Sequence, residues 1–223
     1  MHHVIITGST GMVGKGVLLE CLDSEQIASV LAINRSSLGM AHPKLKELLL
    51  PDFMQLAEHR EMLKGYDGCF FCMGVSVVGL NEAKYTAITY DITKVFADVL
   101  FELNPNLVFN YVSGTGTDST ATGRVMWARV KGKTENYILE KGFKDAYAFR
   151  PGMIIPERGI KSSTGWYNAI YVILRPFFGW LKKCSNITTT TKLGEAMIAS
   201  LTADQLKKHL ENKDINALAE SRA

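Results

Sequence analysis

The stretch Thr7-Gly8-Ser9-Thr10-Gly11-Met12-Val13-Gly14 decides the fold of this chain, because of what stands on either side of it. An apolar run, His3–Thr7, leads into it, and a segment of helical period begins at Gly14. Glycine permits a tight turn at Gly8, the close approach of a pyrophosphate near Gly11, and close packing of helix on strand at Gly14. Free N–H groups at the start of the helix then face the phosphates. Because a strand precedes it and a helix follows it, the stretch predicts a dinucleotide-binding loop. The alternative, a plain glycine-rich turn, would need neither the strand nor the helix.

Apolar runs of strand length alternate with stretches of helical period along the rest of the chain, which predicts β-α-β units around a parallel sheet. The expected strands are His3–Thr7, Ser29–Asn34, Glu47–Leu50, Gly68–Cys72, Leu107–Ser113, Ala146–Arg150 and Asn186–Thr189. The expected helices are Gly14–Leu22, Asn81–Leu103, Arg124–Lys141 and Lys192–Thr202. Right-handed crossovers then give a doubly wound, mostly parallel α/β fold with three layers, α/β/α.

Length and composition fit one domain in a soluble setting. The 223 residues, 47% of them apolar, provide one good core, so we expect a single domain over 1–223 with a small substrate-side portion at about 152–223. The net charge of +3 is spread along the chain and does not point to nucleic acid. The N-terminus shows no export signal and the four cysteines make no disulfide framework, so a cytoplasmic location is expected.

The end of the second expected strand bears on the choice of dinucleotide. About 20 residues beyond the glycines, an NAD-binding protein usually places an acid for the ribose 2′-hydroxyl. This chain has Asn34-Arg35-Ser36-Ser37 there instead. A guanidinium grips a 2′-phosphate bidentately and no carboxylate repels it, so Arg35 favours NADP over NAD, and Lys15 adds positive charge. The alternative is that Arg35 is a solvated loop residue.

Cys69 and Cys72 form a C-x-x-C pattern, which is also found in metal and redox sites. Both fall in the expected strand Gly68–Cys72, where residues three apart point to opposite faces about 10 Å from each other. We therefore interpret them as core cysteines. No cluster of histidines or carboxylates has ligand spacing, so no metal is expected.

Several motifs, taken together and in order, resemble the atypical short-chain dehydrogenases/reductases, which are NAD(P)-binding Rossmann proteins of the epimerase/dehydratase-like type. Within them the chain is similar to the group of HIV Tat-interacting oxidoreductase-like proteins. The resemblance covers nearly the whole chain. Its markers are Gly8-Ser9-Thr10-Gly11-Met12-Val13-Gly14, Asn34-Arg35, Pro51-Asp52-Phe53, Cys72-Met73-Gly74, Tyr111-Val112-Ser113, Val130-Lys131-Gly132-Lys133-Thr134-Glu135 and Phe149-Arg150-Pro151-Gly152.

The resemblance implies a set of cofactor contacts. Asp52 would contact the adenine amino group, and the loop after Arg150 would border the nicotinamide. The full implied set is Gly8, Ser9, Thr10, Gly11, Met12, Val13, Asn34, Arg35, Ser36, Asp52, Cys72, Met73, Gly74, Ser113, Lys131, Pro151, Gly152 and Met153.

The resemblance also implies a reaction centre, a serine followed by Tyr-x-x-x-Lys on a helix, with tyrosine as general acid or base and lysine on the nicotinamide ribose. Ser113 and Lys131 match this pattern, but the tyrosine position holds Trp127. An indole N–H has no usable acidity near neutral pH, so general acid–base help of about 10²- to 10⁴-fold is lost. The run from Tyr137 to Lys141 also spells Tyr-x-x-x-Lys, but Gly142 directly after it indicates the end of the helix.

Two function classes stay open from the sequence, because a fold does not distinguish them. The first is an NADP(H)-dependent oxidoreductase on a small, apolar substrate, whose proton comes from Ser113, Asp118, a water or the substrate. The second is a catalytically silent protein that senses NADP(H). Ser113 and Lys131 favour the first class and Trp127 favours the second.

The most aromatic stretch, Trp166–Leu181, is too short and too interrupted by Arg175 and Pro176 to span a bilayer. It is interpreted as a wall or lid of the substrate pocket, and the alternatives are ordinary packing over the sheet, an oligomer contact or attachment to a membrane surface. Membrane attachment is the disfavoured reading, and the oligomeric state is left open. The charged segment Leu206–Ser221 is expected to be a solvated helix and tail.

Overall fold

The main sheet confirms the expected doubly wound architecture. A computed structural model describes residues 1–160, 184–203 and 207–221, so the aromatic stretch Trp166–Leu181 lies outside the described residues. All strand pairs of the main sheet are parallel, in the order β3-β2-β1-β4-β5-β6-β9. The strands are β1 (His2–Thr7), β2 (Ile27–Asn34), β3 (Leu45–Leu49), β4 (Gly68–Phe71), β5 (Val108–Val112), β6 (Asp145–Arg150) and β9 (His209–Glu211).

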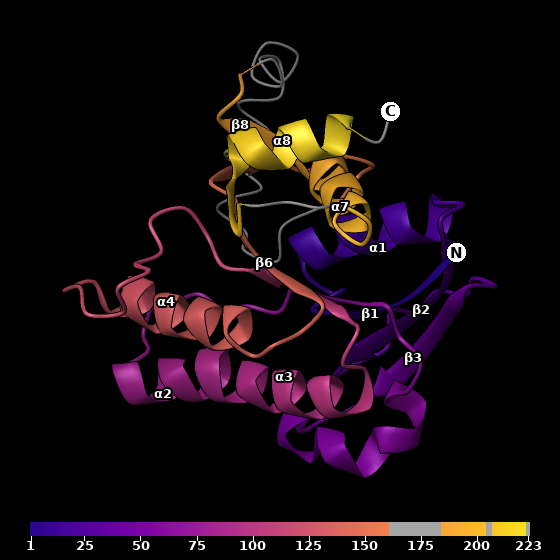
Figure 1. Ribbon diagram of the computed structural model, residues 1–223, viewed down its shortest axis with the longest axis horizontal. Coiled ribbons are helices and arrows are strands. Elements are labelled where there is room, and N and C mark those ends of the chain that lie inside the picture. Colours follow the sequence, from indigo (N-terminus) through magenta and orange to yellow (C-terminus); the bar gives the residue numbers. More distant parts are fainter. Residues whose placement is uncertain (161–183, 204–206, 222–223) are drawn as a thin grey trace.

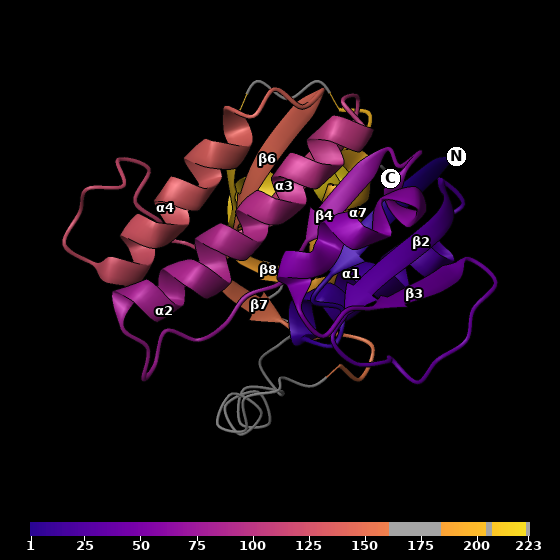
Figure 2. The ribbon, with the colours of Figure 1, turned by 90° about the horizontal axis from the view of Figure 1, so that it is seen from below.

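Helices cover both faces of this sheet (Figures 1 and 2). One face carries α1 (Met12–Asp23), α7 (Thr190–Ala199) and α8 (Asn212–Glu220). The other carries the 3₁₀ segment η1 (Phe53–Leu63), then α2 (Glu82–Thr86), the π-helical turn η2 (Ala87–Asp91), α3 (Ile92–Leu103) and α4 (Met126–Leu139). Three layers result, as the sequence predicts.

Successive side chains of β1 point to opposite faces of the sheet, so this one strand contributes to the core on each face. Val4 and Ile6 point into the core beneath α1 and α7, whereas Ile5 points into the core beneath η1 and α3. All three side chains are completely buried, which is typical of parallel sheets covered on both faces. Because β1 lies between β2 and β4, the strand order reverses there, and ligands of such sheets bind beyond the carboxyl ends of the strands at that point.

A second, two-stranded sheet pairs β7 (Met153–Ile155) with β8 (Ile187–Thr189) in parallel. The expected strand Asn186–Thr189 is thus present, but in this small sheet. Strand β7 was not expected, because three residues directly after a longer strand give no periodic signal of their own.

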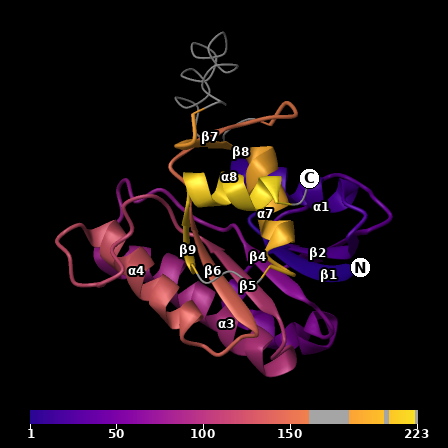
Figure 3. The ribbon, with the colours of Figure 1, turned by 45° about the horizontal axis from the view of Figure 1, so that its top comes forward.

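The C-terminal segment corrects the expectation of a solvated helix and tail. Strand β9 pairs with β6 at the edge of the main sheet, and α8 packs on α7 (Figure 3). Ile215, Leu218 and Ala219 lie at helical spacing and are buried in the core under α1 and α7. The charged side chains of the segment conceal this short apolar face in the sequence. No helix in the described parts of the chain is long and apolar enough to cross a bilayer.

Candidate functional site: a cleft at the glycine loop

The glycine loop joins β1 to α1 and works through close backbone contacts. Gly8 has φ +68°, and a Cβ there would stand 2.8 Å from the backbone of Cys72 at the end of β4. A Cβ on Gly14 would stand 2.3 Å from the carbonyl oxygen of Gly8. Both positions therefore exclude any side chain, because such distances are far below van der Waals contact. A Cβ on Gly11 would meet the Gly8 carbonyl oxygen at 3.4 Å, which is ordinary contact, so this position does not exclude a small side chain.

A buried polar pair ties this loop to β2. The Asn34 amide donates to Ser9 Oγ over 2.8 Å, and Ser9 Oγ lies 3.1 Å from Asn34 Oδ1. Both side chains are buried, Asn34 at 2% and Ser9 at 0% exposure. The two predicted cofactor residues thus hold each other, and they fix the glycine loop against the strand end that carries Arg35.

A cavity of about 380 Å³ opens over this edge of the sheet, where the sequence places the dinucleotide. It brings together three segments that are distant in the chain, namely the glycine loop, the end of β2 and the end of β4. Its lining residues are Gly8, Thr10, Gly11, Asn34, Arg35, Ser36, Phe53, Cys72, Met73, Gly74, Val75, Ile88 and Ile92. Nine of them are residues predicted to hold the cofactor.

Apolar residues complete the lining and were missed from the sequence. Phe53 begins η1, Ile88 lies in η2, and Ile92 begins α3. Nothing local distinguishes them from core residues, since their place at the cavity depends on how η1 and α3 pack against the sheet. Asp52, expected at the adenine, caps η1 by accepting a hydrogen bond from the Met54 N–H over 2.9 Å, and its neighbour Phe53 lines the cavity.

The loop after β2 carries the charge that bears on cofactor choice. Arg35 and Ser36 are exposed and line the cavity. Glu47 on β3 orders this loop by accepting hydrogen bonds from Ser37 Oγ at 3.0 Å and the Leu38 N–H at 2.9 Å. Lys15 lines a neighbouring cavity of about 460 Å³ beyond the glycine loop, where its ammonium lies 3.1 Å from Met40 Sδ.

The C-x-x-C cysteines are free thiols. Cys69 is completely buried in the core, and Cys72 is half-buried at the cavity. Burial raises the pKa of both thiols well above the usual value, so neither has the thiolate character of a redox cysteine. Within the described residues no cluster of potential metal ligands occurs.

Ser113 and Lys131 meet at the carboxyl end of β5. Lys131 on α4 donates a hydrogen bond to the carbonyl oxygen of Ser113. The Ser113 hydroxyl donates to the Glu135 carboxylate and also lies 3.2 Å from the Phe149 carbonyl oxygen. Ser113 is 6% exposed and Lys131 is half-buried. The structure therefore brings the predicted serine and lysine into direct contact.

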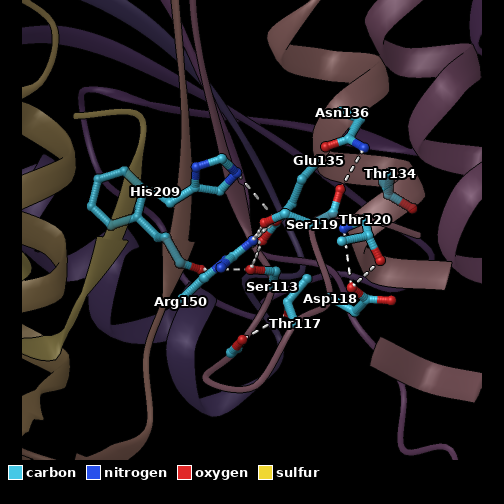
Figure 4. A network of polar contacts seen from close by, with 12 residues as sticks. Ser113, Thr117, Asp118, Ser119, Thr120, Thr134, Glu135, Asn136, Arg150 and His209 are labelled. Carbon is cyan, nitrogen blue, oxygen red and sulfur yellow. Dashed lines mark hydrogen bonds and ion pairs between the residues drawn. The ribbon is translucent and has the colours of Figure 1, made fainter. Parts of the chain in front are cut away.

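The Glu135 carboxylate is the centre of a buried network (Figure 4). Its side chain is 0% exposed, and Arg150 on β6 donates to both of its oxygens, from Nε at 3.0 Å and from Nη2 at 2.5 Å. Arg150 Nη2 also donates to Ser119 Oγ at 2.5 Å, and His209 Nε2 on β9 lies 3.6 Å from Glu135. In the sequence Glu135 and Arg150 belong to two separate motifs and have no predicted role. The structure pairs them next to Ser113.

Burial changes the titration of Lys131 and of its neighbourhood. Desolvation lowers the pKa of the Lys131 ammonium to about 8, against the opposing attraction of Glu135. Desolvation also lowers the pKa of His209, with a further contribution from Arg150. Trp127, one turn before Lys131, is half-buried, and its ring would lie 3.5 Å from a Cβ on Gly116 in the loop after β5.

The alternative pair lies at the end of α4, with Tyr137 in its last turn and Lys141 just after it. Tyr137 and Lys141 both donate to Asp98 on α3, and Tyr137 stacks edge-on against Tyr90. Burial raises the pKa of Asp98, but hydrogen bonds from Lys141, Lys94 and Tyr137 outweigh it and lower that pKa to about 2. This group is a contact between two helices, and Lys131, not Lys141, contacts Ser113.

The loop after β6, expected beside the nicotinamide, is held by the first residue of α8. Asn212 accepts a hydrogen bond from the Gly152 N–H at 3.1 Å and donates to the Met153 carbonyl oxygen at 3.1 Å. The Pro151 carbonyl oxygen accepts from the Thr115 N–H at 3.1 Å. These bonds join the loop to the segment that follows Ser113.

The fold is that of Rossmann-type α/β proteins, and solved short-chain dehydrogenase structures share it. No family model matches the chain. In sequence the chain is similar to protein HTATIP2. The Rattus norvegicus HTATIP2 is 26% identical over 181 residues, which cover 80% of this chain and 71% of HTATIP2.

Solved structures support the same architecture. A short chain dehydrogenase from Burkholderia cenocepacia, determined in complex with NADP, superposes with a TM-score of 0.65 at 13% identity, covering 99% of this chain and 90% of its own. The Bordetella bronchiseptica enzyme WbmF, determined in complex with NAD⁺, superposes with a TM-score of 0.68 at 12% identity, covering 99% and 78%. At such identities these likenesses establish the fold.

Proposed function

We propose that this protein is an NADP(H)-dependent oxidoreductase acting on a small carbonyl or hydroxyl compound. The observation that carries the proposal is the cavity in which the glycine loop, Arg35 and the end of β4 meet. The glycine loop supplies backbone N–H groups for the pyrophosphate, and the segment Cys72–Gly74 borders the adenosine ribose. The apolar character of the substrate rests on the aromatic stretch Trp166–Leu181 and stays a prediction.

The preference for NADP rests on charge at the end of β2. Arg35 is exposed at the cavity, and no carboxylate occupies the usual position for a ribose 2′-hydroxyl. Glu47 reaches this loop, but its oxygens accept from Ser37 and the Leu38 N–H and so order the loop that presents Arg35. A guanidinium on an ordered loop suits a phosphate monoester.

The chemistry divides between the cofactor and the chain. The nicotinamide supplies or accepts a hydride when it is bound. Lys131 and the loop at Pro151 orient the nicotinamide half of the cofactor, and Ser113, held by Glu135, borders the place where the substrate meets it.

A second function, a silent sensor of NADP(H), is favoured by two observations. Trp127 stands where a tyrosine would transfer protons, and the hydroxyl of Ser113 donates its proton to Glu135 within the protein. In that case cofactor occupancy alone would change the surface of the protein.

The cofactor preference is tested by isothermal titration with NADPH and NADH. We expect NADPH to bind more than tenfold more tightly, because a charge-assisted contact contributes about 1.5 to 3 kcal/mol. Arg35→Ala should remove the difference, while Arg124→Ala, at an exposed arginine away from the cavity, should leave it unchanged. Equal affinity of the parent protein for both cofactors would contradict the preference for NADP.

The reaction is tested by following NADPH oxidation with a panel of aldehydes, ketones and quinones. Turnover that increases with substrate concentration supports the oxidoreductase. Tight NADPH binding without turnover on any compound supports the sensor instead.

A further inference from the structure

Carbonyl reduction needs a proton on the carbonyl oxygen as the hydride reaches the carbon. In this chain Trp127 cannot provide it, since an indole N–H has no usable acidity near neutral pH. The proton donor must therefore be another group around Ser113, and its proton must be one that no acceptor of the protein already binds.

Ser113 is not such a group. A hydroxyl has one proton, and the acceptors of this one are the Glu135 carboxylate and the Phe149 carbonyl oxygen, both of which belong to the protein. The hydroxyl consequently offers only lone pairs to an incoming substrate.

The two carboxyl groups nearby hold no proton to give. Glu135 is fully buried and accepts two hydrogen bonds from Arg150, which stabilises its charged form. Asp118 accepts from the Thr120 hydroxyl at 2.7 Å and from the Gly123 N–H at 2.7 Å, and these bonds lower its pKa. Asp118 is therefore a carboxylate at neutral pH, and the Glu135 oxygens are taken up by hydrogen bonds from Arg150.

Unlike Ser113, Glu135 and Asp118, Lys131 has N–H protons that are not used in hydrogen bonds to the described residues. An ammonium has three N–H donors, and within the described residues one acceptor, the Ser113 carbonyl oxygen, is bonded to it. Its Nζ lies 3.8 Å from where a Cβ on Gly114 would stand, so the glycine leaves room beside the ammonium. Lys131 also follows Trp127 by four residues, so both side chains are on one face of α4.

We infer that Lys131 is the proton donor of this protein, in place of the tyrosine that the chain lacks. In reduction, bound NADPH would supply a hydride to the carbonyl carbon, and the carbonyl π electrons would move to oxygen. That oxygen takes a proton from the Lys131 ammonium, giving the alcohol, NADP⁺ and a neutral amine. Solvent then returns a proton to the amine, and oxidation of an alcohol runs through the same steps in reverse.

The electrostatics of the site support this role. Burial lowers the pKa of Lys131 to about 8, so its ammonium releases a proton near neutral pH far more readily than an ordinary lysine does. Glu135, on the same helix, is the charged group that acts on Lys131, and Arg150 on β6 and His209 on β9 in turn face Glu135. Since Arg150 pairs with Glu135, the attraction of that carboxylate for Lys131 is only partly available.

The inference rests on the proposed oxidoreductase function and is tested with Lys131→Arg. Arginine retains a positive charge and N–H donors but does not release a proton at these pH values. We expect NADPH oxidation at pH 7 to fall about 100-fold or more, while NADPH affinity measured by titration changes by less than about tenfold. Trp127→Tyr added to Lys131→Arg should restore a large part of the rate, because a phenol returns to the proton donor's place.

A matched control is Lys133→Arg, two residues further along α4, where the ammonium is exposed and lies 4.1 Å from the centre of the Tyr90 ring. It should leave the rate unchanged. A readout independent of turnover is the ¹³Cε resonance of Lys131, which should titrate near pH 8 in the parent protein and be missing from Lys131→Arg.

Each result decides between distinct conclusions. A Lys131→Arg variant that keeps the parent rate, or a Lys131 resonance that titrates above pH 10, would overturn Lys131 as the proton donor and leave the oxidoreductase standing. A parent protein that binds NADPH and turns over no carbonyl compound would overturn the oxidoreductase, and this role of Lys131 with it.

Discussion

At the scale of single residues, two charged side chains next to Ser113 are stabilised to different degrees. Glu135 is fully buried, and Arg150 donates to both of its oxygens. Lys131 contacts one carbonyl oxygen, so burial lowers its pKa to about 8. An ammonium with so little compensation costs stability, and such costs are typical of functional sites.

Lys131→Met should therefore stabilise the cofactor-free protein at pH 7, by on the order of 1 to 3 kcal/mol. The pKa of Lys131 is about 8 in the folded protein, against an ordinary value of 10.5. Between these values the folded state binds fewer protons than the unfolded state, so the cost is complete below pH 8 and is lost as the pH rises through 10.5. Urea unfolding at pH 7 and pH 10 should show the advantage of the variant shrinking, and a variant less stable than the parent at both pH values would refute this account.

At the scale of elements, the two glycines Gly11 and Gly14 at the junction of β1 and α1 have different roles. A Cβ on Gly14 would stand 2.3 Å from the Gly8 carbonyl oxygen, so this glycine allows helix and turn to touch. A Cβ on Gly11 would meet nothing closer than 3.4 Å and would project where the backbone lines the cavity. Gly14 is therefore required for the fold, and we expect Gly11 to leave room for a ligand.

Alanine at these two positions should accordingly give opposite results. Gly14→Ala should lower the free energy of unfolding by about 1 to 3 kcal/mol or more, because backbone has to move. Gly11→Ala should unfold at nearly the parent urea concentration and lose affinity for NADPH. Unfolding curves and NADPH titration of the same two samples measure both effects, and a Gly11→Ala variant with parent affinity would show that the cofactor does not approach this backbone.

At the scale of the whole molecule, the C-terminal segment completes the fold. Strand β9 lengthens the main sheet, α8 covers one face of it, and Asn212 holds the loop at Gly152. The last described residues are thereby connected both to the core and to the loop expected at the nicotinamide.

Ile215→Ala should lower the free energy of unfolding by about 2 to 5 kcal/mol, since Ile215 on α8 is completely buried in the core and truncation leaves a cavity. Lys213→Ala, on the exposed side of the same helix, should change it by less than about 0.5 kcal/mol. Denaturant unfolding followed by tryptophan fluorescence compares the two variants. A small effect of Ile215→Ala would mean that α8 contributes little to the core.

The sequence by itself determined the parallel α/β architecture, the glycine loop and the position of Arg35, whereas Ser113 and Lys131 were implied by the family resemblance. These are local signals: the first six expected strands end within two residues of the observed ones, because apolar runs of strand length are confined by turns. The dinucleotide loop was recognisable because a strand, glycines and a helix follow one another directly along the chain.

Tertiary structure alone decided the rest. Glu135 and Arg150 lie on different elements and become a pair only when α4 packs beside β6, and Phe53 reaches the cavity only when η1 packs on the sheet. Strand β9 has three residues, and its place beside β6 depends on a partner some 60 residues earlier in the chain. A buried pair, a cavity wall and an edge strand are defined by neighbours in space, and the chemistry of a residue in the sequence does not specify which neighbours folding will bring to it.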